Sequence, residues 1–344
     1  MGGRILKKKY VIIFIICIFL FTNISAIGFK VNTQVDNKSG LILLNKTIIV
    51  PDDYPTIQEA IDSANNGDTV FVKSGIYEEN VIIKKNEIIL KGENKDTTVI
   101  DGGIVNNIIT VKADYFHISD FTLKNGNQSS IKLDESDNIV IENNKILPSS
   151  TYGINIENSN NITIENNIIL DSRDIGIQTE FSRNCKISKN HIINENMGVG
   201  IALFDGGNIE IFNNSINKCS GGIKVDWILT GDNIIDYNQV INNTQGLIFQ
   251  KIDNFTITYN QIESSSMGID FYDSYRIYVI QNNFIYNIKN ALFIDSNIYW
   301  DRNYWDKPRN FPYIIIGFNE FLIFFKIPRI NIDWHPAKAP HIIN

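Results

Sequence analysis

Apolar and polar residues alternate along most of this chain, and the alternation itself repeats with a long period. Residues 153–157 read Gly-Ile-Asn-Ile-Glu, in which the two isoleucines are separated by a polar residue. A period of two is typical of a β-strand with one buried face, and the 3.6-residue spacing of a helix does not occur in the repeated region. The pattern therefore predicts short strands.

Each repeat begins with a small residue followed by an aliphatic one. Successive markers lie 23, 23, 24, 22, 24, 22 and 23 residues apart. They are Ser130-Ile131, Gly153-Ile154, Gly176-Ile177, Gly200-Ile201, Gly222-Ile223, Gly246-Leu247, Gly268-Ile269 and Ala291-Leu292. An asparagine keeps the same phase, at Asn144, Asn167, Asn190, Asn214, Asn238, Asn260 and Asn283. Two markers in step indicate a structure built by repetition.

A unit of 22–24 residues is too short to bury its own apolar face, so neighbouring units must stack. The unit accommodates three short strands, each paired with its equivalent in the next coil at about 4.8 Å. Isoleucine then stacks on isoleucine inside, and asparagine stacks on asparagine at a tight corner, where the amides hydrogen-bond. We therefore predict an all-β fold, a single-stranded right-handed parallel β-helix of about ten coils.

Both ends of such a stack need cover, because open strand edges promote aggregation. Residues 55–61 predict a short capping helix with Thr56 and Glu59 as a capping box, and an aromatic tail after Asn303 is predicted to cover the last coil. The expected organisation is a signal peptide or N-terminal anchor (1–26), a linker (27–47), an N-terminal cap with the first coils (48–106), the β-helix repeats (107–300) and a C-terminal cap (301–344).

The first residues predict a targeting segment. Arg4 and three lysines at 7–9 precede an apolar run over residues 11–21, which is followed by Ser25 and Ala26. A charged start, a short apolar core and a small-residue exit are typical of a secretory signal peptide. We therefore expect an extracellular or cell-surface monomer that meets a membrane only if this segment stays uncleaved.

Charge and cysteine usage narrow the classes of partner. The formal net charge is -7 and the pI is near 5.2. Phosphate binding needs clustered Lys and Arg, so no nucleic-acid partner is expected.

Cys185 falls in an apolar column and Cys219 at a turn position, at different offsets in the repeat, so neither a disulfide nor a cysteine metal site is expected.

Candidate chemistry lies on the outward positions of the strand that begins each coil. The fourth residue after each small residue reads Asp134, Glu157, Glu180, Phe204, Asp226, Gln250, Tyr272 and Asp295. The second reads Lys132, Asn155, Gln178, Ala202, Lys224, Ile248, Asp270 and Phe293. The first three carboxylates should therefore stack on one face, where like charges on adjacent strands repel unless something compensates them.

Three hypotheses remain open for these carboxylates. In the first, Glu157 and Glu180 are the catalytic pair of a glycosidase. In the second, Asp134, Glu157 and Glu180 bind Ca²⁺, which prefers clustered oxygen ligands. In the third, they form a solvated acidic face that Lys132 and Lys224 partly relieve.

Aromatic residues interleaved with carboxylates follow farther along the same face, among them Phe204, Trp227, Tyr272 and Phe293. Sugar rings offer apolar faces and hydroxyl edges, and such a mixture of side chains suits both. The predicted substrate-binding residues are Asp134, Asp226, Trp227 and Tyr272.

Several segments resemble known β-helix proteins. Residues 50–61 (VPDDYPTIQEAI), 66–72, 75–81 and 98–103 are similar to the opening of pectin-lyase-like proteins, pectinesterases included. The coils at 107–300 resemble the carbohydrate-binding and sugar-hydrolase repeats of NosD-type proteins. The Asn303-Tyr-Trp-Asp turn and residues 332–337 are similar to endings of prokaryotic surface proteins with these repeats. The resemblance implies the β-helix fold and a carbohydrate partner.

The motifs that carry chemistry in related enzymes are missing. The sequence contains neither the Gly-x-x-Asp-Phe-x-Phe-Gly and Arg-Pro-Trp elements of pectinesterases nor, in the repeats at 107–300, the Asp-Asp and Gly-His-Gly elements of polygalacturonases. NosD-type proteins are often described as copper-binding, but the four His and three Met here do not cluster. We therefore expect a carbohydrate-binding or scaffolding protein without a required cofactor, Ca²⁺ being the one considered. A polysaccharide hydrolase or lyase and a purely structural surface component are the alternatives.

Overall fold

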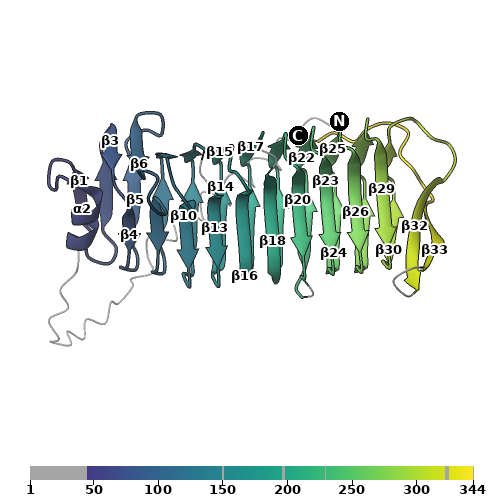
Figure 1. The fold of residues 1–344 in the computed structure, drawn as a ribbon, viewed down its shortest axis with the longest axis horizontal. Coiled ribbons are helices and arrows are strands. Elements are labelled where there is room, and N and C mark those ends of the chain that lie inside the picture. The colour runs from purple at the N-terminus through teal and green to yellow at the C-terminus, as the bar shows by residue number, and fades with distance from the viewer. Residues whose placement is uncertain (1–44, 149–150, 196–197, 229, 322–324, 344) are drawn as a thin grey trace, which may run out of the picture. The chain divides into compact units, whose positions relative to one another are not determined.

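The computed structural model describes residues 45–148, 151–195, 198–228, 230–321 and 325–343. The predicted signal peptide and residues 27–44 of the predicted linker lie outside this part of the chain. From Asn45 onward the strands stack one behind another along a single axis (Figure 1). No helix in these ranges has the length and apolarity that a membrane span requires.

Each turn of the stack contributes one strand to each of three walls. The first wall contains β4 (Val81–Ile83), β7 (Ile109–Val111), β10 (Ser129–Asp134), β13 (Tyr152–Glu157), the first halves of β16 (Ile175–Ser188) and β18 (Val199–Phe212), β20 (Gly221–Asp226), β23 (Gln245–Gln250), β26 (Met267–Tyr272) and β29 (Lys289–Ile294). The second contains β1 (Thr47–Val50), β2 (Thr69–Val72), β5 (Ile89–Gly92), β8 (His117–Ser119), β11 (Ile139–Glu142), β14 (Asn160–Glu165), the second halves of β16 and β18, β21 (Asn233–Asp236), β24 (Asp253–Thr258), β27 (Tyr275–Ile280) and β30 (Ile298–Asp301). The third contains β3 (Gly75–Glu78), β6 (Thr98–Asp101), β9 (Thr122–Lys124), β12 (Lys145–Ile146), β15 (Ile168–Leu170), β17 (His191–Ile193), β19 (Ser215–Asn217), β22 (Gln239–Ile241), β25 (Gln261–Glu263), β28 (Asn283–Ile285) and β31 (Tyr304–Trp305).

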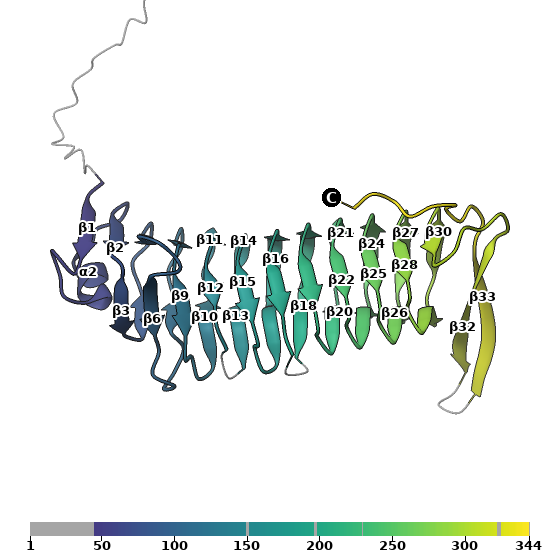
Figure 2. The ribbon, with the colours of Figure 1, turned by 90° about the horizontal axis from the view of Figure 1, so that it is seen from above.

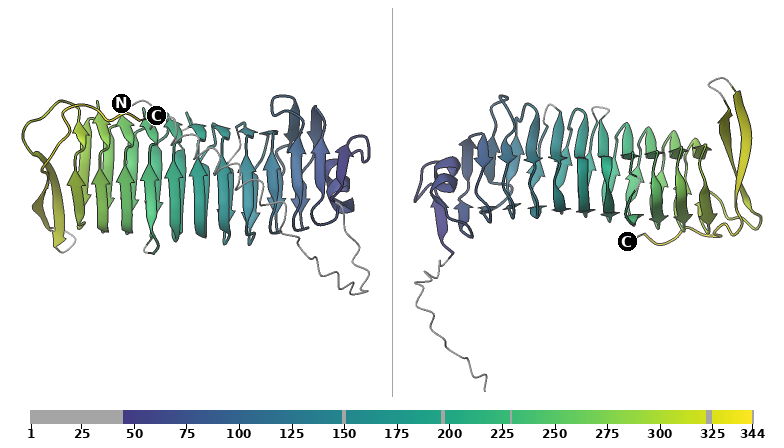
Figure 3. Two further views of the ribbon diagram at one scale, coloured as in Figure 1. Left: turned by 180° about the vertical axis from the view of Figure 1, so that it is seen from behind. Right: turned by 90° about the horizontal axis from the view of Figure 1, so that it is seen from below.

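Every strand in the three walls pairs in parallel with its equivalent in the next turn, for example β10 with β13 and β13 with β16. The third wall has eleven strands in the described residues, so the stack holds at least eleven turns where about ten were expected. Figure 3 shows the same end-to-end order from behind and from below. The predicted right-handed parallel β-helix is confirmed.

Columns of apolar side chains fill the interior. On the first wall Ile131, Ile154 and Ile177 pair in register and are fully buried, and the column continues through later turns. Each buried isoleucine contributes roughly 1.5–3 kcal/mol relative to an exposed one. Because every turn covers its neighbours, the apolar stabilisation belongs to the stack and not to any single coil.

The corner between the second and third walls carries a buried asparagine ladder. Asn167 Oδ1 accepts hydrogen bonds from the backbone N–H and the Nδ2 of Asn144, at 2.9 and 3.2 Å. The same two bonds link each later member to the next, through Asn190, Asn214, Asn238, Asn260, Asn282 and Asn303. The buried carboxylate of Asp333 ends the ladder by accepting from Asn303 N and Nδ2 at 3.0 and 3.1 Å.

The ladder corrects one predicted member. Asn282 holds the ladder position, whereas Asn283 lies beside it and donates from Nδ2 to the backbone oxygen of His341 at 2.8 Å. The coil from Asn260 to Asn282 has 22 residues, one fewer than the common repeat, and both candidate asparagines are adjacent. Spacing alone therefore chose the wrong one.

The same shortening moves the first wall by one residue. Ala291 pairs with Ile269, so Asn290 takes the small-residue position that was predicted for Ala291. Phe293, predicted to point outward, is fully buried, and Asp295 moves from the fourth to the fifth position. A slip of one residue turns every side chain of a strand to the opposite face.

A short helix closes the N-terminal end of the stack. It is α2 (Ile57–Ser63), which lies beside β1 (Figure 2). Thr56 Oγ1 accepts from Glu59 N at 3.2 Å, so the predicted N-cap is present. The carboxylate of Glu79 adds a second cap by accepting from the backbone N–H groups of Ile57 and Gln58, at 2.9 and 3.0 Å.

An antiparallel hairpin of β32 (Tyr313–Phe321) and β33 (Phe325–Asp333) lies at the other end (Figure 2). β32 pairs with β29 where Phe318 meets Ile294. Trp305 stacks between Phe284 and Tyr313, with ring centroids 4.6 and 4.2 Å from its own. The aromatic C-terminal cap is therefore confirmed. The hairpin lies in the part of the chain where the 23-residue repeat has ended.

Replacing Asn214 by Ala should lower the free energy of unfolding by at least about 2 kcal/mol, because several buried backbone and amide groups lose their partners. The matched change is Asn184→Gly, which removes two exposed side-chain bonds, one donated to Asn161 and one accepted from Asn208, both at 3.0 Å, and suits the positive φ of 54°. Urea unfolding should place the midpoint of Asn214→Ala well below that of Asn184→Gly. Equal midpoints would show that the buried ladder is not a main source of stability.

Candidate functional site

The corner between the first and second walls is built on left-handed backbone. The fifth residue after each small position has φ between 46° and 62°, at Glu135, Asn158, Phe181, Asp205, Trp227, Lys251, Asp273 and Asp295. This conformation turns the chain sharply and leaves these side chains outside the core. Phe181 and Trp227 are consequently 55% and 52% exposed. We call these eight residues the corner column.

A buried serine follows the corner column in most turns. Ser159 Oγ accepts from the backbone N–H of Ser136 at 3.0 Å, and Ser182 Oγ accepts from Ser159 N at 3.1 Å. The next turn has Gly206 in this place, and a side chain there would lie 2.2 Å from the backbone oxygen of Ser182. Gly207 is equally confined, with Thr230 O at 2.6 Å from the position of its Cβ. Close backbone approach therefore requires glycine here.

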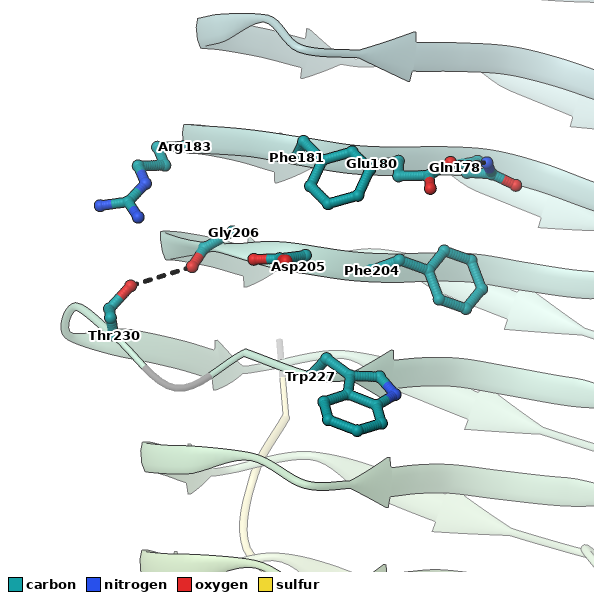
Figure 4. A pocket seen from close by; sticks show the side chains of 9 residues that line it. All are labelled: Gln178, Glu180, Phe181, Arg183, Phe204, Asp205, Gly206, Trp227 and Thr230. Atoms are coloured by element: carbon teal, nitrogen blue, oxygen red, sulfur yellow. Dashed lines mark hydrogen bonds between the residues drawn. The ribbon is translucent and has the colours of Figure 1, made fainter.

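The loop after β20 is longer than its counterpart one turn earlier. Asp226 and Asn233 are seven residues apart, whereas the paired positions Phe204 and Ile209 are five apart. The extra length brings Thr230 against the previous turn, where its Oγ1 donates to Gly206 O at 3.0 Å (Figure 4). The loop thus forms one rim of a depression.

The depression, which we call the aromatic hollow, has a volume of about 660 Å³. Rings from three successive turns, Phe181, Phe204 and Trp227, lie around it (Figure 4). Its lining is Gln178, Glu180, Phe181, Arg183, Phe204, Asp205, Gly206, Trp227 and Thr230. Apolar faces with a few polar groups at the edges are the usual composition of a small-molecule site.

Cations hold two of the rings in place. Lys251 Nζ lies 3.7 Å from the centroid of Trp227, and Lys224 Nζ lies 5.4 Å from that of Phe204. Among the described residues neither Glu180 nor Asp205 has an ion-pair partner within 4.0 Å. Two unneutralised carboxylates therefore stand at the edge of the hollow as hydrogen-bond acceptors.

The three predicted carboxylates do stack. Asp134 pairs in register with Glu157, and Glu157 with Glu180. Lys132 forms an ion pair with Glu157, as expected, and Lys112 Nζ lies 3.2 Å from Asp134 Oδ2, which was not expected. Of the three, only Glu180 lines the aromatic hollow.

The donor groups of the described residues bear on the calcium and copper hypotheses. In the described ranges no three or more His, Cys, Asp or Glu side chains gather as a metal site. Asp134 and Glu157 are each paired with a lysine, which favours the solvated acidic face over the calcium hypothesis. For copper the fit is poor, because Cys185 lies in the second wall and Cys219 in the turn after β19, and no group of three or more His, Cys, Asp or Glu side chains gathers around either in the described residues.

The predicted substrate-binding residues do not form one group. Trp227 lines the aromatic hollow, whereas Asp226 is 7% exposed and pairs with Lys224 at 3.0 Å without lining it. Asp134 lies two turns before Glu180 on the same column. Tyr272 lies two turns beyond Asp226 on that column, through Gln250.

Tyr272 belongs to a second depression of about 490 Å³ between the first-wall corner and the C-terminal hairpin. Its lining is Tyr272, Asp273, Tyr275, Asp295, Asn319, Glu320, Ile327 and Arg329. We call it the Tyr272 hollow. Both hollows open along the same corner of the stack.

Sequence reasoning missed two residues of this face and the partial burial of a third. Phe181 and Asp205 belong to the corner column, which strict alternation does not reveal. Burial raises the pKa of Asp270 above its usual value of 3.8, and Lys289 lowers it in part. Asp270 was already named in the second-position column, but its partial burial becomes visible only in the structure.

Two family models match the chain. One described as "Right handed beta helix region" matches residues 106–226, and one described as "Periplasmic copper-binding protein (NosD)" matches residues 199–319. Neither match spans half of the chain, and both agree with the three parallel walls described above. The chain has the right-handed parallel β-helix fold, and residues 199–319 are similar to NosD-type proteins. No curated protein sequence matches it significantly.

Solved structures of similar fold include several β-helix proteins. The A-module of mannuronan C-5 epimerase AlgE4 from Azotobacter vinelandii has a TM-score of 0.53 and 16% identity, over 76% of this chain and 83% of that one. XylC in complex with xylose has 0.56 and 13%, over 81% and 72%. PfbA, a surface adhesin of Streptococcus pneumoniae, has 0.54 and 15%, over 82% and 95%. At these identities the likeness concerns the fold alone.

Cys185 and Cys219 should resist alkylation in the native β-helix protein. With a pKa of about 12, the reactive thiolate is a fraction on the order of 10⁻⁴ at pH 8, and both thiols are buried. Mass spectrometry after iodoacetamide treatment should find both unmodified in buffer and modified in urea. Labelling in buffer would contradict their place in the core.

Replacing Asp270 by Asn should raise stability at neutral pH. The folded pKa of Asp270 lies above 3.8, so stability is lost as pH rises from 3.8 through the folded pKa. The Asp270→Asn variant does not lose this stability as pH rises. Its melting temperature should therefore exceed that of the unchanged protein at pH 7 and match it at pH 3. Asp134→Asn, which breaks an exposed ion pair with Lys112, is the control and should give no gain at pH 7. A gain of equal size at both pH values would refute the electrostatic explanation.

Proposed function

We propose that this β-helix protein is exported to the cell surface, where it binds a polysaccharide in the aromatic hollow. The observation that carries the proposal is the convergence of Phe181, Phe204 and Trp227 with the unneutralised carboxylates of Glu180 and Asp205. Aromatic faces pack against the apolar faces of sugar rings, while carboxylates accept hydrogen bonds from hydroxyl groups.

The rigid stack supports this proposal. The three rings come from successive turns whose backbones are locked together by parallel pairing. Side chains held in place before binding lose little conformational freedom when a ligand arrives, which favours affinity. Export is supported by the N-terminal charge pattern and by the match to a family described as periplasmic.

The solved structures add support of a general kind. One is a mannuronan epimerase, one was determined with xylose and one is a surface adhesin. Similar folds therefore include proteins that act on a polysaccharide, hold a sugar or adhere at a surface. A carbohydrate partner for this chain is in keeping with all three.

A polysaccharide-acting enzyme is the second candidate. Glu157, one of the predicted catalytic pair, is paired with Lys132, so the carboxylates available at the hollow are Glu180 and Asp205. Shortening of a bound polymer would establish catalysis, and its loss in Glu180→Gln would assign the residue.

Replacing Trp227 by Ala should weaken the binding of a polysaccharide that the unchanged protein binds by at least about tenfold, equivalent to about 1.4 kcal/mol. Its control is Tyr286→Ala, because Tyr286 is 73% exposed and also has positive φ, at 54°, but lies in another column. Both variants should keep the circular dichroism spectrum of the β-helix. Affinity electrophoresis or calorimetry with a panel of polysaccharides would then separate the two; equal binding by both variants excludes the aromatic hollow as the site.

A further inference from the structure

We propose that the polysaccharide bound on this face carries no acidic groups and lies along the stack axis from the aromatic hollow to the Tyr272 hollow. The inference rests on the proposed function and adds the class of polymer and its direction. It follows from the charges of the first wall, the ion pairs among them and the spacing of the two hollows.

The outward positions of the first wall are strongly acidic. Over eight turns the outward residues that stand second and fourth after the small position include one and four carboxylates, respectively. The corner column adds four more, which makes nine in all. The same columns contain three lysines, Lys132, Lys224 and Lys251. A polyuronate or sulfated polymer on this wall would bring anions against an excess of anions.

The ion pairs leave some carboxylates unpaired at both hollows. Lys132 and Lys224 are paired with Glu157 and Asp226, neither of which lines a hollow. Among the residues that line the aromatic hollow, Glu180 and Asp205 stand against one guanidinium, that of Arg183, while the Lys251 ammonium group lies over the Trp227 ring. Like charges about 4 Å apart cost roughly 1 kcal/mol in water and more near a protein surface. Hydroxyl groups instead donate hydrogen bonds to the same carboxylates.

The Tyr272 hollow repeats this composition. Asp273, Asp295 and Glu320 line it with one cation, Arg329, and Glu320 also forms an ion pair with Lys326 at 3.3 Å, which leaves two carboxylates against one guanidinium. Tyr272 is 36% exposed and offers an aromatic surface beside these carboxylates. Both depressions therefore combine aromatic side chains with a net negative lining.

The two hollows are spaced along one straight path. Asp226, next to Trp227, pairs with Gln250, which pairs with Tyr272, so two turns separate the rings by about 10 Å along the axis. Lys251, whose ammonium group covers one face of Trp227, stands between them. An extended polymer running along the axis would contact both hollows at once, and each contact raises the effective concentration of the other.

The test uses polymers that share a backbone and differ in charge, hydroxyethyl cellulose against carboxymethyl cellulose and unsulfated against sulfated galactan. For the full-length protein at low salt, we expect the neutral member of a pair to bind at least about tenfold more tightly. The difference should shrink at high salt, because salt screens repulsion between exposed charges. An acidic member that binds as tightly as its neutral counterpart at low salt overturns the inference. Failure of every polymer to bind overturns the proposed function as well, a result distinct from binding without charge preference.

Two sets of variants test the origin of the preference. The double variant Glu180→Gln and Asp205→Asn should raise the acidic-to-neutral affinity ratio at least about threefold, while Asp134→Asn, two turns from Glu180, should not. With neutral oligosaccharides of increasing length, the affinity loss caused by Tyr272→Ala should grow with length. A ratio that stays constant in the double variant contradicts the charge argument, and a length-independent loss contradicts the axial path.

Discussion

The structure depends on one constraint, the in-register parallel pairing of each turn with the next. Pairing fixes the position of every residue relative to the turns on either side, so a buried asparagine must meet another asparagine or an equivalent acceptor. Asp333 supplies that acceptor where the ladder ends. Variation in coil length is confined to the corners, and the loop after β20 is an example. Its two extra residues lengthen the separation of the paired residues before the loop, Asp226 and Gln250, to 24. The paired residues after the loop, Asn233 and Phe255, are only 22 apart, so the register is restored.

The candidate site is a local consequence of this constraint. A column of left-handed corner residues places side chains outside the core in every turn, and the chemistry at each level depends on which residue occupies that position. Phe181, Asp205 and Trp227 follow one another there. The adjacent glycines allow the backbone to approach closely at the same place, so the rings surround a depression instead of a flat wall. A rigid, repetitive scaffold thus carries a site that no single coil contains.

Much of the fold could be predicted because strand alternation and the asparagine phase report burial directly. The fourth-position column was right from Asp134 to Tyr272. It was wrong at its last member, Asp295, because a 22-residue coil shifts the register by one and two asparagines stand side by side. The site was less predictable. The alternation of apolar and polar residues does not reveal in which direction a corner side chain points. The ion pair of Lys112 with Asp134 joins two successive turns, and it can be recognised only once the stacking of the turns is known.

The most direct test of the account is a crystal structure of the β-helix protein with a neutral oligosaccharide that it binds. We expect sugar rings packed against Phe181 and Trp227, with hydroxyl groups donating to Glu180 and Asp205 and the saccharide continuing along the axis towards Tyr272. Sugar bound instead on the second wall, for example over the exposed Tyr278 and Tyr299, would contradict it and move the site to a different face of the same stack.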